Sequence, residues 1–164
     1  MNRPLWDTRN DLPEKVRVGA IELLNHRLAD VLDLSLQAKQ AHWNVKGPSF
    51  IALHELFDEV VKELGEYADD LAERTVELGG TALGTARIVA KASRLAEYPL
   101  DISSGREHVT ALSGALATFG SSARAAIDAA NARGDADTTD LFTQISRGVD
   151  KLLWKVEAHA QAKD

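Results

Sequence analysis

Apolar residues recur at helical spacing along four long stretches of the chain. The first predicted helix, residues 11–43, opens at Asp11 as its N-cap, with Glu14 three residues later to complete a capping box. The second predicted helix, residues 49–78, follows Pro48. We expect this proline at the first helical position, because the N–H that proline lacks would be unbonded there anyway. A pair of glycines then provides a stop signal for the helix.

Two more long helices are predicted after a linker. Ser104 and Glu107 form a second capping box that opens a helix running to about residue 132. Asp137 and Asp140 open the last helix, and an alanine-rich stretch at residues 86–92 predicts a short helix inside the linker. No stretch shows the alternation typical of a strand. The pattern therefore predicts an all-α four-helix bundle.

Composition narrows the chemistry that such a bundle can carry. The 164 residues fit one domain, and they include no cysteine, so any metal must be held by histidine nitrogen and carboxylate oxygen. The balance of 19 basic against 25 acidic residues disfavours a nonspecific nucleic-acid binder. No apolar run approaches the roughly 20 residues of a membrane span. The first residues lack the apolar segment of a signal peptide, so we expect a cytoplasmic protein.

The second predicted helix carries two pairs of potential metal ligands. His54 and Asp58 lie one turn apart, as do Asp69 and Glu73, and all four fall on one face of the helix. Asp58 and Asp69 are nevertheless about 16 Å apart along the helix axis, so a single metal ion cannot contact both pairs of one chain.

A two-fold axis resolves this separation. If the helix crosses its own copy near residues 63–64, the first pair of one subunit meets the second pair of the other, and two identical sites form. His42, near the end of the first helix, would add a second imidazole. Two imidazoles with three carboxylates suit iron or manganese. The alternative is that these acidic residues form only a solvated helix face.

Several stretches of the chain resemble the Dps family of mini-ferritins. The stretches are LQAKQAHWNVKG at residues 36–47, FIALHE at 50–55, LGGTALGT at 78–85, YPLDI at 98–102 and DKLLW at 150–154. The signature His-x11-His-x3-Asp-x10-Asp-x3-Glu is complete in this chain and extends from His42 to Glu73. The resemblance extends from about residue 8 to residue 157. Glu-x-x-His, the motif of metal sites inside a single bundle, is absent from the sequence.

The resemblance implies a fold and an assembly. It implies a ferritin-like four-helix bundle over residues 11–159, with a short helix between the second and third long helices. Residues 1–10 and 160–164 would be short tails. Members of the family form hollow shells of twelve subunits, so the resemblance implies a homo-oligomer, a dodecamer.

The resemblance also implies an activity. Such shells oxidise Fe(II) with hydrogen peroxide or oxygen and store Fe(III), which protects DNA from oxidative damage. The ferroxidase centre lies at the two-fold interface. One subunit would supply His42, His54 and Asp58, and the other would supply Asp69 and Glu73. Trp43 would either donate an electron there or simply pack at the interface.

Three aspartates at the start of the last helix form a second candidate site. Asp135, Asp137 and Asp140 lie where family shells admit iron through acidic three-fold channels. An acidic ring concentrates cations through its local field. Helix capping and the helix dipole select the same residues, so this alternative stays open.

Two other function classes compete with the ferroxidase hypothesis. The first is a nucleoid-compacting DNA-binding protein with secondary iron chemistry, but the first ten residues carry only Arg3 and Arg9 as basic residues. Polycationic tails bind DNA by neutralising phosphates, and neither terminus is of that kind, so DNA binding is doubtful. The second is a helical scaffold whose metal ligands are vestigial. His26, His108 and His159 have no comparable neighbours and receive no role.

Overall fold

The chain folds as four long helices and one short helix. A computed structural model describes residues 5–161. The helices are α1 (Glu14–Asn44), α2 (Phe50–Glu77), α3 (Ala86–Ala92), α4 (Gly105–Asn131) and α5 (Ala136–Gln161). The predicted all-α four-helix bundle and its short helix are therefore confirmed. Residues 1–4 and 162–164, parts of the two predicted tails, lie outside the described residues.

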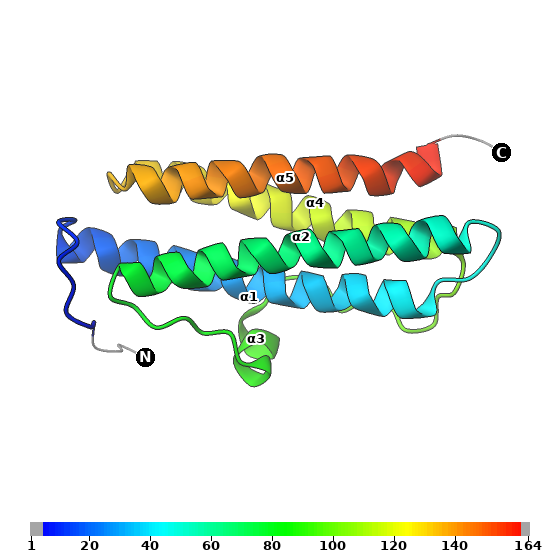
Figure 1. Ribbon diagram of the computed structural model, residues 1–164, viewed down its shortest axis with the longest axis horizontal. Helices are drawn as coiled ribbons and strands as arrows, with labels where there is room; N and C mark the ends of the chain where they lie inside the picture. The colour runs from blue at the N-terminus through cyan, green and yellow to red at the C-terminus, as the bar shows by residue number, and fades with distance from the viewer. Residues whose placement is uncertain (1–4, 162–164) are drawn as a thin grey trace.

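The long helices form two antiparallel pairs, α1 with α2 and α4 with α5, which lie along one another (Figure 1). The connection from α2 to α4 runs the length of the bundle and carries α3 outside it, against α1 (Figure 1). One end of the bundle therefore contains the end of α1 and the starts of α2 and α4. The other end contains the end of α2 and the start of α5 (Figure 1).

The core consists of one continuous apolar cluster between the four helices. Phe57, Phe119 and Phe142 are fully buried at its centre. None of the helices within residues 5–161 combines the length and the apolarity that crossing a bilayer requires.

The predicted roles of Asp11 as an N-cap and of Pro48 as a first helical residue were wrong, and proline geometry explains both. The N-cap of α1 is Pro13, not Asp11, because the residue before a proline is disfavoured in helical geometry. Pro48 lies in a turn closed by a hydrogen bond from the Phe50 N–H to the Gly47 carbonyl (3.1 Å), so Ser49 caps α2. Proline favours the second position of such a turn over the first position of the helix.

The predicted stops and the second capping box agree better with the structure. α2 ends just before Gly79, whose φ of +84° is a conformation that suits glycine. The Ser104 hydroxyl accepts a hydrogen bond from the Glu107 N–H, and the Glu107 carboxylate accepts one from the Ser104 N–H. This box fixes the start of α4 beside the end of α1.

Candidate metal centre

His42 and His54 lie face to face where α1 ends and α2 begins. Their ring centroids are 3.7 Å apart and the planes are inclined by 20°. The tight turn after Asn44 reverses the chain, so the last turn of α1 lies beside the first turn of α2. The predicted pairing of these two histidines is therefore present within one subunit.

Backbone carbonyls fix the orientation of both rings. Nδ1 of His42 is 2.7 Å from the carbonyl of His54, and Nδ1 of His54 is 2.8 Å from the carbonyl of His42. A carbonyl only accepts hydrogen bonds, so each Nδ1 is the donor, which leaves Nε2 as the nitrogen available to a metal ion. Metal-binding histidines commonly have this arrangement, in which a backbone carbonyl orients the ring.

Asp58 lies close to this pair and is held by a lysine. The Lys39 ammonium donates a hydrogen bond to the Asp58 carboxylate from the facing turn of α1. That hydrogen bond lowers the pKa of Asp58 below its ordinary value, and the two imidazoles act in the same direction. The predictions had not included Lys39. Its position three residues before His42, on the same helix face, was the available signal.

The other two predicted ligands lie further along α2. Asp69 and Glu73 are exposed, as Asp58 is. Within residues 5–161 of one chain, no three histidine or acidic side chains gather closely enough to hold a metal ion. The structure thus brings His42 and His54 into contact, with Asp58 close enough to be influenced by both rings, and Asp69 and Glu73 lie further along α2.

A shallow groove of about 450 Å³ runs beside Asp69. Its walls come from α1, α2 and the connection after α2, and include Leu28, Leu32, Ala68, Ala72 and Ala82. Large apolar side chains also remain uncovered near the two histidines: Leu36 is 63% exposed, Trp43 65% and Ile51 61%. Exposed apolar surface of this kind is typical of a face that another molecule covers.

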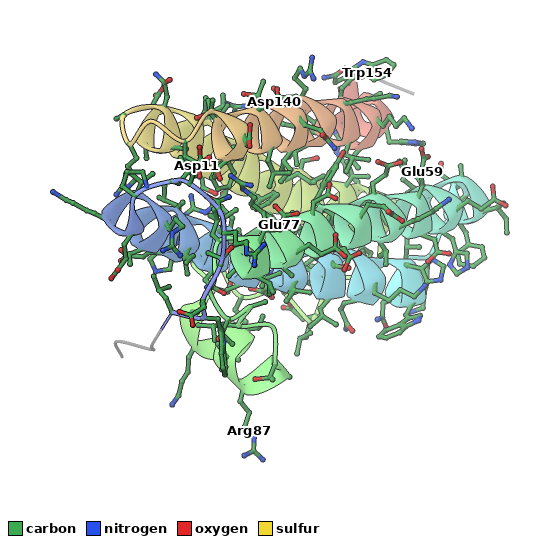
Figure 2. All side chains as sticks on the ribbon, turned by 60° about the vertical axis from the view of Figure 1, so that its left-hand side comes forward. Asp11, Glu59, Glu77, Arg87, Asp140 and Trp154 are labelled. Atoms are coloured by element: carbon green, nitrogen blue, oxygen red, sulfur yellow. The ribbon has the colours of Figure 1, made fainter. Side chains whose placement is uncertain are left out.

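The three aspartates of the second candidate site have different environments. Asp135 is buried, and its carboxylate accepts hydrogen bonds from the Thr138 N–H (3.0 Å), the Thr138 hydroxyl (2.6 Å) and the Arg74 guanidinium (3.0 Å). It is therefore the N-cap of α5, a role that we had predicted for Asp137 and Asp140. Those two residues are exposed, and Figure 2 shows Asp140 on α5.

Residues 21–163 match the model of the ferritin-like domain. A DNA protection during starvation protein of Agrobacterium fabrum is 47% identical over 156 residues, which cover 95% of this chain and 96% of the relative.

Solved structures agree. Dps from Microbacterium arborescens in the high iron form is 32% identical, with a TM-score of 0.85 over 94% of this chain and 99% of that chain. DpsC from Streptomyces coelicolor is 27% identical, with a TM-score of 0.93 over 98% of this chain and 94% of that chain. The chain belongs to the Dps family of ferritin-like proteins.

Proposed function

We propose that this chain is the subunit of an iron-oxidising and iron-storing shell. The observation that carries the proposal is the His42–His54 pair, in which both Nδ1 atoms are bonded to backbone carbonyls and both Nε2 atoms keep their lone pairs. A pair of histidines that only packed would have no need for two matched, oriented rings beside a carboxylate. Two oriented imidazoles and a carboxylate are ligands that suit a divalent cation.

The centre is completed across a two-fold axis. One subunit offers His42, His54 and Asp58, and a second subunit offers Asp69 and Glu73 from the middle of its own α2. The groove beside Asp69 and the exposed apolar side chains near the histidines support a contact between copies at this face. The assembly that this contact builds is a closed shell, a dodecamer as in the family.

Iron is the substrate of the centre. Two Fe(II) ions give two electrons to one hydrogen peroxide, which takes up two protons and leaves as two water molecules, or the electrons pass to oxygen. Three hard carboxylates stabilise Fe(III) over Fe(II), and so favour oxidation. Trp43, next to His42 and largely exposed, is placed to pack on the partner or to donate an electron.

Iron enters near the start of α5. Asp137 and Asp140 are exposed there, Asp137 in a loose ion pair with Arg74 (3.8 Å), and would line a three-fold channel with their symmetry mates. Asp135 points its carboxylate at Thr138 and Arg74, so its contribution to a channel is indirect: it holds the helix end. We expect the shell in the cytoplasm, where removal of iron and peroxide together protects DNA from oxidation.

Fe(II) oxidation by the purified protein tests the proposal. Fe(II) is added without oxygen, peroxide is injected, and Fe(III) absorbance and particle size are followed. We expect rapid oxidation, with the iron retained in a particle of about twelve subunits. His42→Ala with His54→Ala removes the oxidation, whereas the exposed His159→Ala serves as a matched control. Oxidation no faster than in buffer would contradict the proposal, and a gel shift at low and moderate salt then tests the DNA-compacting alternative.

A further inference from the structure

Tyr98 and His108 form a buried hydrogen-bonded pair behind the candidate metal centre. The Tyr98 hydroxyl is 2.8 Å from Nδ1 of His108, and the two rings are nearly parallel, with an interplanar angle of 17°. Tyr98 is 7% exposed and His108 is 1% exposed. Burial raises the pKa of the Tyr98 phenol and lowers the pKa of the His108 imidazole, so both groups are neutral.

The pair is more polar than packing requires. Within the described part of the chain, Nε2 of His108 has no hydrogen-bond partner. The backbone carbonyl of Asn44 lies near enough to favour the protonated ring. An imidazole with an incompletely bonded nitrogen costs stability in a core where apolar side chains would pack without that loss. A buried polar pair of this kind calls for a role besides packing.

Contacts between helix ends place the pair next to the centre. Asn44 directly follows Trp43 and lies two residues after His42 at the end of α1. The Lys46 N–H donates to the Ser103 carbonyl (2.9 Å), which joins the turn after α1 to the start of α4. A Cβ at Gly105 would be 2.6 Å from Leu53, the neighbour of His54.

We propose that the Tyr98–His108 pair is a proton-coupled electron donor that quenches one-electron oxidising equivalents arriving from the metal centre through Trp43. The source of those equivalents rests on the proposed function. When one Fe(II) reduces hydrogen peroxide by a single electron, the products are Fe(III), hydroxide and a hydroxyl radical. The radical takes an electron from the Trp43 indole and becomes hydroxide.

The second step moves an electron and a proton together. The Tyr98 phenol returns an electron to the Trp43 radical cation, and its O–H proton passes to Nδ1 of His108. The O–H bond breaks and an N–H bond forms. The products are intact tryptophan, a neutral phenoxyl radical and an imidazolium, which the Asn44 carbonyl stabilises. Without a base at 2.8 Å, the buried phenol would have to become a radical cation, which the apolar surroundings disfavour.

The chain offers a matched control in Tyr67, its only other tyrosine. Tyr67 is as buried as Tyr98, at 7% exposed. Its hydroxyl faces a carboxylate oxygen of Glu63 at 3.5 Å, which is a poor hydrogen bond, and no imidazole is bonded to it. We therefore expect the phenoxyl radical to form at Tyr98 and not at Tyr67.

Pulse radiolysis of the iron-free assembled protein tests the transfer directly. Azide radicals oxidise exposed indoles, and Trp6→Phe with Trp154→Phe leaves Trp43 as the only one. We expect the indole radical absorbance to decay as phenoxyl absorbance rises. Tyr98→Phe should reduce the phenoxyl yield by at least about tenfold and Tyr67→Phe should leave it unchanged. His108→Gln should slow the transfer by about a hundredfold, the lower range for loss of a positioned base.

Three results would overturn the inference: no phenoxyl radical, the same yield in Tyr98→Phe, or the same rate in His108→Gln. Tyr98→Phe removes a single oxygen atom, so it keeps the test valid if His108→Gln fails to assemble. Because the measurement contains no iron, it is independent of the Fe(II) oxidation assay. A failed oxidation assay with intact phenoxyl transfer contradicts the proposed function, whereas normal iron oxidation without transfer contradicts this inference.

Discussion

The two ends of the bundle both carry clusters of charged side chains, and the clusters differ in how fully their polar atoms are bonded. At one end Asp135 is buried and its carboxylate accepts three hydrogen bonds, from Arg74 and twice from Thr138. At the other end His42 and His54 use only Nδ1, and Asp58 is exposed. Saturated groups hold a structure together, whereas groups with remaining lone pairs at a surface can bind a ligand.

His42, His54 and Asp58 form an open cluster, whose polar atoms are only partly bonded. Removing its histidines should have the largest effect on activity and little effect on stability. His42→Ala with His54→Ala deletes two ligands and should lower the rate of Fe(II) oxidation by more than about a hundredfold, since even loss of a supporting residue costs up to that much. Stopped-flow absorbance measures the rate. A rate within a few-fold of the parent, with assembly intact, would show that the histidine pair is structural.

Asp135, Thr138 and Arg74 form a saturated cluster. Removing its carboxylate should lower stability and have little effect on activity. Asp135→Ala deletes the N-cap of α5 and leaves the Arg74 guanidinium without its buried partner, which should cost about 2 kcal/mol of stability. Thermal unfolding of the assembled protein measures the loss. Asp137→Ala is the matched control, because that side chain is exposed and should change stability by less than about 0.5 kcal/mol. Equal losses in the two variants would contradict the distinction.

Acidification should lower the stability of the protein through His108, which lies at the same end of the bundle as the open cluster. Burial holds the pKa of His108 below its ordinary 6.5, so between that value and its lower folded value the unfolded chain binds more protons than the folded chain. The contribution of His108 to stability is therefore present above pH 6.5 and falls as the pH drops below it. Unfolding midpoints between pH 8 and pH 5 should decline less in His108→Gln. An unchanged pH slope in that variant would assign the acid sensitivity to other groups.

The smallest effect should come from Lys39, which partly saturates the open cluster. Lys39→Met frees the Asp58 carboxylate from an ion pair that is largely open to solvent, and such pairs contribute little. Affinity for Zn(II), a redox-inert probe, should rise by about two- to fivefold. Isothermal titration measures it. A weaker affinity would mean that Lys39 orients Asp58 for the metal and does not compete with it.

The helices could be predicted from the sequence because their signals are local. The Ser104–Glu107 capping box, the stop before Gly79 and the short helix at residues 86–92 depend on neighbours a few residues apart. The starts near Pro13 and Pro48 were misjudged because a proline also restricts the residue before it and favours turns.

The candidate site was predictable only in part. The spacing along α2 predicted that Asp58 lies too far from Asp69 and Glu73 to share a metal ion with them in one chain. The contact between the end of α1 and the start of α2 stacks His42 on His54. The exchange of Nδ1–carbonyl bonds was not predictable, because backbone carbonyls carry no sequence signal. Nor was the burial of Asp135 against Arg74, which lies sixty-one residues away in the sequence. Whether Asp69 and Glu73 complete the centre depends on a second copy of the chain.

Complementation between two inactive variants shows whether the centre is shared between subunits. One variant carries His54→Ala and Asp58→Ala, and the other carries Asp69→Ala and Glu73→Ala; each alone should fail to oxidise Fe(II). In shells co-assembled from equal amounts, half of the two-fold interfaces are mixed, and each mixed interface contains one whole centre. The account predicts about a quarter of the parent activity in these shells. No recovery in mixed shells that assemble normally would contradict a centre shared between subunits.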